Sequence, residues 1–352
     1  MIKNRNLLVT GGAGFIGCNF VHFWLKNHPA DKVVVLDALT YAGNRASLDP
    51  VKDNPNYSFV HGNICDGTLV ETLLHEYSIN TIVHFAAESH VDRSISGPDA
   101  FLETNIIGTH VLLKAAKKLW LDGEKIIPHL FHHVSTDEVY GTLGEDDPPF
   151  TETTPYAPNS PYAASKASSD HLVRAYHETY GLQTTISNCS NNYGPYQFPE
   201  KLIPLIITNI LHNKPLPVYG DGLQIRDWLY VDDHCRGIDL VIRKGRVGEN
   251  YNIGGNNEWK NIDIVKLVCK YMDQAFNQRS DLTIQYPLAI MAQRGKSASL
   301  IMHIDDRLGH DRRYAIDATK AFHELRFEPF ESLESGFLRT IAWYLEGDQS
   351  EE

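Results

Sequence analysis

The feature that most constrains the fold is a glycine motif near the start of the chain. The motif Thr10-Gly11-Gly12-Ala13-Gly14-Phe15-Ile16-Gly17 follows a strand-like run over 7–10 and precedes a helix-like run over 15–26. Its G-x-x-G-x-x-G spacing lets a strand turn tightly into a helix, lets the backbone approach a pyrophosphate, and lets helix and strand pack closely. The motif therefore predicts a strand–helix unit that binds a dinucleotide.

The first half of the chain continues this alternation of short apolar strands and amphipathic helices. We expect strands over 32–37, 57–61, 81–84, 129–135 and 184–188, and helices over 66–77, 101–119 and 161–180. Such alternation is typical of an α/β fold with a doubly wound parallel sheet of Rossmann type. After residue 188, prolines crowd the chain and predict irregular structure up to about residue 217.

Two units are expected from a chain of 352 residues. A strand over 226–231, a helix over 232–243 and a strand over 249–253 predict that the chain returns to the sheet. We therefore expect residues 1–188 to form the dinucleotide-binding domain, with residues 224–253 returning to it. Residues 189–223 and 254–352 would form a smaller C-terminal substrate-binding lobe.

Composition argues against several classes of protein. Lys plus Arg total 32 against 44 Asp plus Glu, and no basic run offers a surface for nucleic acid phosphates. No apolar stretch of about 18 residues predicts a membrane span, and no signal peptide is evident, so we expect a cytoplasmic protein. The five scattered cysteines contain no C-x-x-C pair, so we expect neither a disulfide framework nor a metal site.

The end of the second predicted strand indicates which dinucleotide binds. Asp37 lies about 20 residues beyond the glycine motif, where a carboxylate can bind both ribose hydroxyls. The same carboxylate would repel a ribose phosphate. The sequence therefore favours NAD over NADP.

Two further groups of residues indicate catalysis. Tyr162 and Lys166 are four residues apart at the start of a predicted helix, so they lie on one face, where Lys166 can stabilise the phenolate of Tyr162. Thr136, Asp137 and Glu138 follow the predicted strand 129–135. The two adjacent carboxyls offer one acid and one base, which is what an elimination needs.

The glycine motif and the Tyr-x-x-x-Lys pair together resemble the extended short-chain dehydrogenase/reductase superfamily. From Asn6 to about Tyr344 the chain is similar to the dTDP-glucose 4,6-dehydratase family, most specifically over 86–94, 135–141, 188–196, 198–205, 224–231 and 306–311. Two positions depart from the family pattern. Asn63 stands where relatives usually have Asp, and Leu308 stands where the family has Pro.

The resemblance implies bound NAD and a nucleotide-sugar substrate. The implied cofactor-binding residues are Gly11, Gly14, Phe15, Ile16, Gly17, Asp37, Ala38, Leu39, Thr40, Asn63, Ile64, Phe85, Ala86, Ala87, Glu88, Ser89, Thr104, Tyr162, Lys166 and Asn192. The implied substrate-binding residues are Ser89, Thr136, Asn191, Lys201, Leu202, Ile203, Pro204, Leu205, Pro217, Val218, Tyr219, Arg226, Asn261, Asp306, Arg307 and His310. The implied catalytic set is Thr136, Asp137, Glu138, Tyr162 and Lys166.

The reaction that the resemblance implies is the dehydration of dTDP-glucose to dTDP-4-keto-6-deoxyglucose, in deoxysugar biosynthesis. It would proceed by oxidation at carbon 4, elimination across carbons 5 and 6, and hydride return to carbon 6. Three alternatives stay open: a 4-epimerase, a 4,6-dehydratase of a UDP- or GDP-sugar, and a non-catalytic NAD-binding sensor. The resemblance also implies a homodimer, because the apolar helices 101–119 and 161–180 are of the kind that pair across a two-fold axis in relatives, as a four-helix contact.

Overall fold

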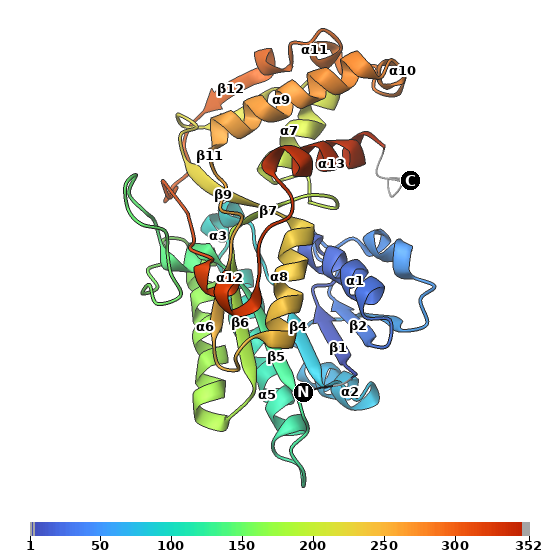
Figure 1. Ribbon diagram of the computed structural model, residues 1–352, viewed down its shortest axis with the longest axis vertical. Helices are drawn as coiled ribbons and strands as arrows, with labels where there is room; N and C mark the ends of the chain where they lie inside the picture. Colours follow the sequence, from blue (N-terminus) through green and yellow to red (C-terminus); the bar gives the residue numbers. More distant parts are fainter. Residues whose placement is uncertain (1, 3, 347–352) are drawn as a thin grey trace.

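A computed structural model describes residue 2 and residues 4–346, and its centre is a seven-stranded sheet (Figure 1). The sheet has the order β10-β6-β5-β4-β1-β2-β3, and all neighbouring strands are parallel. These strands are β1 (Asn6–Thr10), β2 (Lys32–Asp37), β3 (Tyr57–His61), β4 (Thr81–His84), β5 (Leu130–Thr136), β6 (Thr184–Cys189) and β10 (Asn250–Ile253). This order confirms the predicted doubly wound fold, whose crevice lies where the strand order reverses between β1 and β4.

Helices cover both faces of the sheet because its strands are apolar on both sides. Leu7 and Val9 of β1 belong to one hydrophobic core, whereas Leu8 belongs to the other. This alternation is the period of two that a strand imposes on its side chains. The first core is covered by α1 (Phe15–Asn27) and α8 (Val231–Lys244), and the second by α2 (Gly67–Glu76), α5 (Thr109–Trp120) and α6 (Pro161–Tyr180).

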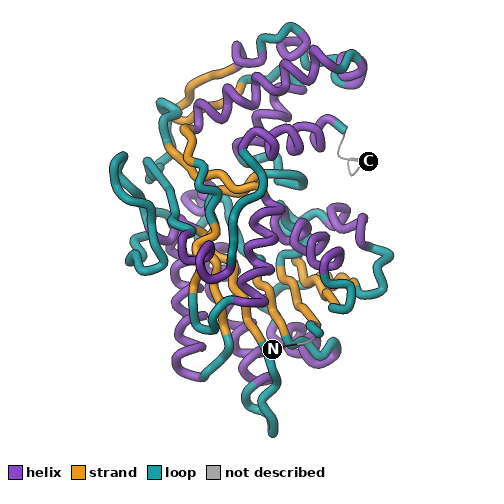
Figure 2. The backbone as a smooth tube through the Cα atoms, in the orientation of Figure 1, coloured by secondary structure: helices purple, strands orange, loops and turns teal. Residues whose placement is uncertain are grey.

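The C-terminal lobe has a hydrophobic core of its own and lies beyond the carboxyl ends of the large sheet (Figure 2). It contains a sheet of β7 (Asn191–Tyr193), β9 (Ile225–Tyr230) and β11 (Glu258–Lys260), and a pair of β8 (Leu216–Tyr219) with β12 (Ile301–Ile304). Its longer helices are α7 (Leu202–Leu211), α9 (Asn261–Gln278) and α13 (Leu333–Leu345). In the whole described chain, the remaining short helices are α3 (Val91–Ser96), α4 (Asp99–Phe101), α10 (Asp281–Gln285), α11 (Ile290–Gln293) and α12 (Thr319–Leu325). The 3₁₀ turns are at Arg45–Val51, Asp137–Tyr140 and Ser297–Leu300.

The return of the chain to the large sheet differs from the prediction at one strand. Strand β10 pairs with β6, so this part of the chain returns to the large sheet, and helix α8 packs against α1. Strand β9, however, pairs with β7 and β11 in the smaller sheet. The physical reason is that Trp228 and Tyr230 pack against Tyr193 in the core of the lobe, so β9 is held by the lobe.

The segment predicted as one helix over 101–119 is interrupted. It begins as α4, continues as a π-helical stretch over Leu102–Gly108, and becomes regular only at α5. Within the π-helical stretch, Asn105 Nδ2 donates to Ser165 Oγ at 2.8 Å and to Glu88 O at 3.0 Å. These bonds hold the widened turn against α6 and the loop after β4, and π-helical turns of this kind are frequent at functional sites.

Within the described residues, no helix is long and apolar enough to cross a membrane. The same residues contain no cluster of three or more His, Cys, Asp or Glu side chains arranged to hold a metal ion. All five cysteines are free thiols, and four of them are buried.

Candidate active site

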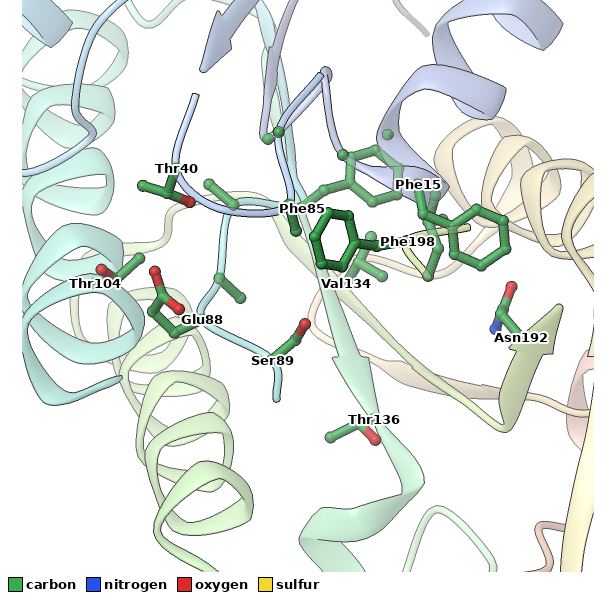
Figure 3. A pocket seen from close by; sticks show the side chains of 18 of the residues that line it. Phe15, Thr40, Phe85, Glu88, Ser89, Thr104, Val134, Thr136, Asn192 and Phe198 are labelled. Carbon is green, nitrogen blue, oxygen red and sulfur yellow. The ribbon is translucent and has the colours of Figure 1, made fainter. Parts of the chain in front are cut away.

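A cavity of about 330 Å³ lies at the carboxyl ends of the large sheet. Its wall brings together the turn between β1 and α1, the ends of β4 and β5, the start of α6 and the loops that follow β6. Figure 3 shows Phe15, Phe85, Phe198 and Asn192 around one part of the cavity and Thr40, Glu88 and Thr104 around another.

Nearly all of the predicted cofactor residues line this cavity. They are Gly11, Gly14, Phe15, Ile16, Gly17, Asp37, Ala38, Thr40, Asn63, Ile64, Phe85, Ala86, Ala87, Glu88, Ser89, Thr104, Tyr162, Lys166 and Asn192. Leu39 is not among the lining residues. Its backbone N–H donates to Asp37 Oδ1 at 2.8 Å, so it orients a neighbour that does line the cavity.

The glycine motif leaves space where a side chain would clash. Gly11 has φ +69°, and a Cβ atom there would lie 2.6 Å from the backbone nitrogen of Ala86. At Gly17 a Cβ atom would lie 2.2 Å from the carbonyl oxygen of Gly11. Gly14 caps the N-terminus of α1 without a side-chain hydrogen bond. The N–H groups and positive dipole end of α1 are thus available to a phosphate, which fits a dinucleotide.

Asp37 is held in place at the end of β2. Its Oδ2 accepts from Ala13 N at 2.8 Å, while burial raises its pKa and the two backbone N–H bonds oppose that rise. Each carboxylate oxygen keeps a further lone pair that can accept from a ribose hydroxyl. At the departure from the family pattern, Asn63 Oδ1 accepts from Cys65 N at 2.9 Å, so this amide oxygen stabilises a turn.

The predicted catalytic residues lie on two adjacent elements of the cavity wall. Thr136 ends β5 and caps the 3₁₀ turn that carries Asp137 and Glu138, with its Oγ1 accepting from Glu138 N at 3.3 Å. Tyr162 and Lys166 occupy the first turns of α6 and line the same cavity. The triplet 136–138 and the pair Tyr162 and Lys166 therefore line the same cavity.

The surroundings of Tyr162 favour its neutral phenol, whereas the sequence predicts a phenolate that Lys166 stabilises. Burial, followed by the charge of Glu138, raises the pKa of Tyr162 well above its ordinary value. Lys166 Nζ donates to Val134 O at 2.9 Å and lies 3.4 Å from His133 Nε2. The phenol is therefore protonated here, and stabilisation of its phenolate by Lys166 stays a prediction.

The environments of the two carboxyls are unequal. Burial, then Glu138 and Asp227, raise the pKa of Asp137 well above its ordinary value, and Asp137 Oδ2 has no hydrogen-bond partner among the described residues. Burial also raises the pKa of Glu138, but three nearby cations, Arg226, Lys201 and Arg307, oppose the rise. Two titratable groups with such different surroundings can divide into an acid and a base.

The three cations come from the lobe and are held by separate contacts. Lys201 Nζ donates to Ser89 O at 3.0 Å. Arg226 Nη2 donates to Asp311 O at 3.0 Å, and its guanidinium lies over the ring of Tyr314. Arg307 forms an ion pair with Asp92 at 2.8 Å and lies over the ring of Tyr219.

The predicted substrate residues, these three cations included, divide into those that line the cavity and those that do not. Ser89, Thr136, Asn191 and Lys201 line the cavity, whereas the remaining ones do not: Leu202, Ile203, Pro204, Leu205, Pro217, Val218, Tyr219, Arg226, Asn261, Asp306, Arg307 and His310. Ile203, Pro204 and Val218 are buried and do not line the cavity. The ring of Tyr219 lies 6.0 Å from that of His310, and His310 Nδ1 lies 2.6 Å from Asp306 Oδ1.

Several residues that sequence reasoning did not select also line the cavity. They are Leu36, Ala42, Gly43, Gly62, Val134, Ser135, Cys189, Ser190, Gln197, Phe198 and Glu200. Most of them adjoin segments that carried the family resemblance, and this adjacency was the available signal. Ala42 and Gly43 gave none, because the loop after β2 has no motif of its own.

The chain can be compared with known proteins on this basis. The family model described as GDP-mannose 4,6 dehydratase matches residues 8–340. A dTDP-glucose 4,6-dehydratase of Salmonella typhimurium is 52% identical, covering 97% of this chain and 93% of the relative. One from Xanthomonas campestris pv. campestris is 55% identical, covering 96% and 92%.

A solved structure agrees with these relatives. The crystal structure of a dTDP-glucose 4,6-dehydratase from Streptomyces venezuelae, with NAD bound, has a TM-score of 0.85 and 48% sequence identity, and the match covers 97% of each chain. Fold, cavity and sequence therefore agree over nearly the whole length. The chain belongs to the family of nucleotide-sugar 4,6-dehydratases whose members include the dTDP-glucose 4,6-dehydratases.

Proposed function

We propose that this protein is a hydro-lyase that converts dTDP-glucose to dTDP-4-keto-6-deoxyglucose and water, with NAD as its bound cofactor. The observation that carries the proposal is the unequal carboxyl pair, Asp137 and Glu138, in the same cavity as Tyr162 and Lys166. An oxidation alone needs only the tyrosine and the lysine. An acid beside a base adds the means to eliminate water.

Bound NAD would supply the hydride chemistry, as acceptor from carbon 4 and donor to carbon 6. Tyr162, as a phenolate that Lys166 stabilises, takes the proton of the hydroxyl on carbon 4 and becomes a phenol. Thr136 hydrogen-bonds the sugar at the same oxygen. The ketone acidifies the proton on carbon 5, which Glu138 removes while Asp137 protonates the hydroxyl that leaves carbon 6 as water. When the hydride returns to carbon 6, Glu138 returns its proton to carbon 5 and gives the 4-keto-6-deoxy sugar.

The lobe holds the nucleotide in this proposal. Asn191, Lys201, Arg226, Asn261 and Arg307 bind the pyrophosphate and sugar, because guanidinium and amide donors suit phosphate oxygens. Asn261 Oδ1 at the start of α9 is buried without a partner among the described residues, so this oxygen can accept a hydrogen bond from a sugar hydroxyl. The 202–205 backbone would complete the phosphate side, with Pro217, Val218 and Tyr219 beside the base and Asp306 and His310 beside Arg307.

The proposed division of the chain follows from these roles. Residues 1–188 and 224–253 form the NAD-binding unit, although β9 within the second range pairs with the lobe. Residues 189–223 and 254–352 form the nucleotide-sugar lobe. Residues 1, 3 and 347–352 of these ranges lie outside the described part of the chain.

The alternatives are weaker for particular reasons. A 4-epimerase has no need of the acid–base pair at 137 and 138. A sensor would gain nothing from keeping both carboxyls beside Tyr162 and Lys166. Although the matching family model is named for a GDP-sugar enzyme, the curated relatives above 50% identity act on dTDP-glucose by name.

One experiment separates these alternatives. Purified protein with NAD is incubated with dTDP-glucose, UDP-glucose and GDP-mannose, and each mixture is scanned for the keto-sugar chromophore in base. We expect product from dTDP-glucose at a rate at least about tenfold above the others, a difference of about 1.4 kcal/mol in transition-state binding. Equal rates with all three would contradict the base specificity, and a 4-epimer without a keto-sugar would contradict dehydration.

Two further parts of the proposal concern the protein's setting. A homodimer would form through the segments 101–119 and 161–180, which lie side by side in the structure. A cytoplasmic location would suit an enzyme of nucleotide-sugar metabolism. Light scattering and cell fractionation test these two points independently of the activity.

A further inference from the structure

Asp170 is a buried carboxylate to which the mechanism above gives no role. It lies on α6 one turn after Lys166, and only 2% of its surface is exposed. A buried charge is costly unless other groups compensate for it. Its neighbours should therefore indicate what the charge is for.

One oxygen of Asp170 connects three elements of the site. Asp170 Oδ2 accepts from Ser135 Oγ at 2.8 Å and from the Tyr156 hydroxyl at 2.9 Å. It also accepts from Asn188 Nδ2 at 3.4 Å, and the same amide donates to Thr136 O at 3.2 Å. Helix α6 is thus tied to the ends of β5 and β6, and the catalytic threonine and the two carboxyls lie at the end of β5.

The other oxygen lies beside His133, which also lies beside the active-site lysine; Asp170 Oδ1 has no hydrogen-bond partner among the described residues. His133 Nε2 lies 3.2 Å from Asp170 Oδ1 and 3.4 Å from Lys166 Nζ. Burial, followed by the charge of Lys166, lowers the pKa of His133 well below its ordinary value, so the ring is neutral. The carboxylate and the ammonium therefore lie beside the same nitrogen of an uncharged, buried ring.

Among the described residues, Asp170 is the group that raises the pKa of Lys166 most, against the effect of burial. Burial lowers the pKa of Lys166, and Asp170, then Cys189, raise it. Burial raises the pKa of the Cys189 thiol above the neutral range, and burial keeps the nearby His84 neutral. No second anion among these groups could replace Asp170.

Asp170 itself is ionised under working conditions. Burial raises its pKa to about 6, and Lys166 together with the hydrogen bonds from Ser135, Tyr156 and Asn188 opposes that rise. The other titratable group facing it, Tyr140, has a raised pKa because of burial and is a neutral phenol. Above about pH 6 the carboxylate form therefore prevails.

We propose that Asp170 is a positioning residue: a buried carboxylate that keeps Lys166 in its ammonium form and holds the ends of β5 and β6 against α6. The inference rests on the proposed function, because Lys166 acts there through the phenolate of Tyr162. Without the carboxylate, a charged lysine in this interior would have no compensating anion. Tyr162 would then lose its cation as the pH rises.

The variant Asp170→Asn tests the charge, because it keeps the shape and an acceptor oxygen for Ser135 and Tyr156. Holoenzyme with NAD is mixed with dTDP-glucose between about pH 6.5 and 9.5, and the first hydride transfer is followed as NADH absorbance. Removing the anion lowers the pKa of Lys166, so the variant should lose rate as the pH rises. A fall of one pKa unit makes the difference about tenfold at the alkaline end.

The matched control is Tyr156→Phe, which removes one hydrogen bond to Asp170 and leaves its charge. We expect this control to follow the alkaline profile of the unmodified protein. Equal losses in both variants at every pH would mean a purely structural role and overturn the inference, as would an unchanged rate in Asp170→Asn. If the Asn variant does not fold, Asp170→Ser carries the same comparison, since its hydroxyl is neutral and can accept a hydrogen bond.

A direct titration separates this inference from the proposed function. The pKa of Lys166 is measured by NMR on selectively labelled lysine, with Lys166→Arg to assign the signal. It should fall by about one unit or more in Asp170→Asn, whether or not dTDP-glucose is turned over. An unchanged Lys166 pKa overturns the inference alone, whereas failure of the unmodified protein to form NADH with dTDP-glucose overturns the proposed function alone.

Discussion

At the scale of single residues, the division of labour between Tyr162 and the carboxyl pair can be tested by substitution. Asp137→Asn and Glu138→Gln should leave the first hydride transfer largely intact and lower product formation by about 100- to 10,000-fold, the usual effect of losing a general acid or base. Bound NADH should then accumulate and be visible in absorbance. Tyr162→Phe should prevent NADH formation, because it removes the group that takes the proton from the carbon 4 hydroxyl.

The same experiment can contradict the assignment in two ways. Glu138→Gln turning over near the unmodified rate would show that another group is the base. If all three variants fail before hydride transfer, the carboxyls position the sugar and do not carry out the elimination. Unchanged NAD affinity in each variant is the control for a merely damaged site.

The unequal carboxyls also predict how elimination depends on pH. Glu138 must be ionised, so the rate should rise as the pH rises through its pKa, which burial holds above the ordinary value. Asp137 must be protonated, so the rate should fall as the pH rises through its own pKa, which burial, Glu138 and Asp227 raise further. Single-turnover product formation should therefore be bell-shaped, with limits that belong to the coupled pair.

Asp137→Asn provides the check on this profile. It should remove the alkaline decline and keep the acidic limb, whereas Glu138→Gln should do the reverse. An alkaline decline that persists in Asp137→Asn would assign that limb to another group.

At the scale of elements, the glycine turn between β1 and α1 gives a prediction with a built-in control. Gly11→Ala combines a left-handed backbone, at φ +69°, with a contact of 2.6 Å to the Ala86 backbone. Gly181→Ala at the end of α6 has a similar φ, +74°, but nothing lies within 4 Å of the added carbon. Each should lose about 1–2 kcal/mol of unfolding free energy to the strained φ, and only Gly11→Ala should also lose NAD binding.

Thermal unfolding with and without NAD measures both effects. The stabilisation that NAD gives should survive in Gly181→Ala and disappear in Gly11→Ala. If both variants keep it, the turn does not approach the cofactor closely.

The elements that could be predicted from sequence are those that local sequence signals define. Strands β2, β3 and β4 have the predicted bounds because each is a short run rich in β-branched and aromatic residues. Helix α6 has the predicted bounds because Ser160 and Pro161 mark its start and the left-handed Gly181 marks its end. Helix α7 was missed because prolines crowd the region, yet Pro204 lies in the first turn of α7, where a missing N–H costs no helical bond. The prediction that the strand over 226–231 returns to the large sheet was wrong, because the lobe core that holds Trp228 is assembled from segments distant in sequence.

The same limit applies to the site. Asp37, Tyr162 and Lys166 could be selected because local spacing carries their chemistry. The contact of Asp170 with Ser135 joins positions 35 residues apart, and that with Asn188 joins positions 18 apart. No local pattern reports such contacts, so the environment of Lys166 emerged only from the fold.

At the scale of the whole molecule, the proposed homodimer predicts that apolar side chains exposed in the single chain are buried between two subunits. Leu102 and Ile107, on the π-helical stretch beside α6, are 47% and 45% exposed. Large apolar side chains on neighbouring helices are the material of an isologous interface around a two-fold axis. Burying them in a dimer interface would contribute about 25 cal/mol of stabilising free energy for each Å² of apolar surface removed from water.

The test is a pair of charge substitutions with a control elsewhere. Leu102→Glu combined with Ile107→Glu should shift the protein from dimer to monomer in light scattering at micromolar concentration, because two buried glutamates in each subunit would lack partners. Ile284→Glu, at an 84% exposed position in the lobe, should leave the dimer unchanged. A monomer before any substitution would contradict the proposed assembly, and a dimer that tolerates the double change would place its interface on another face.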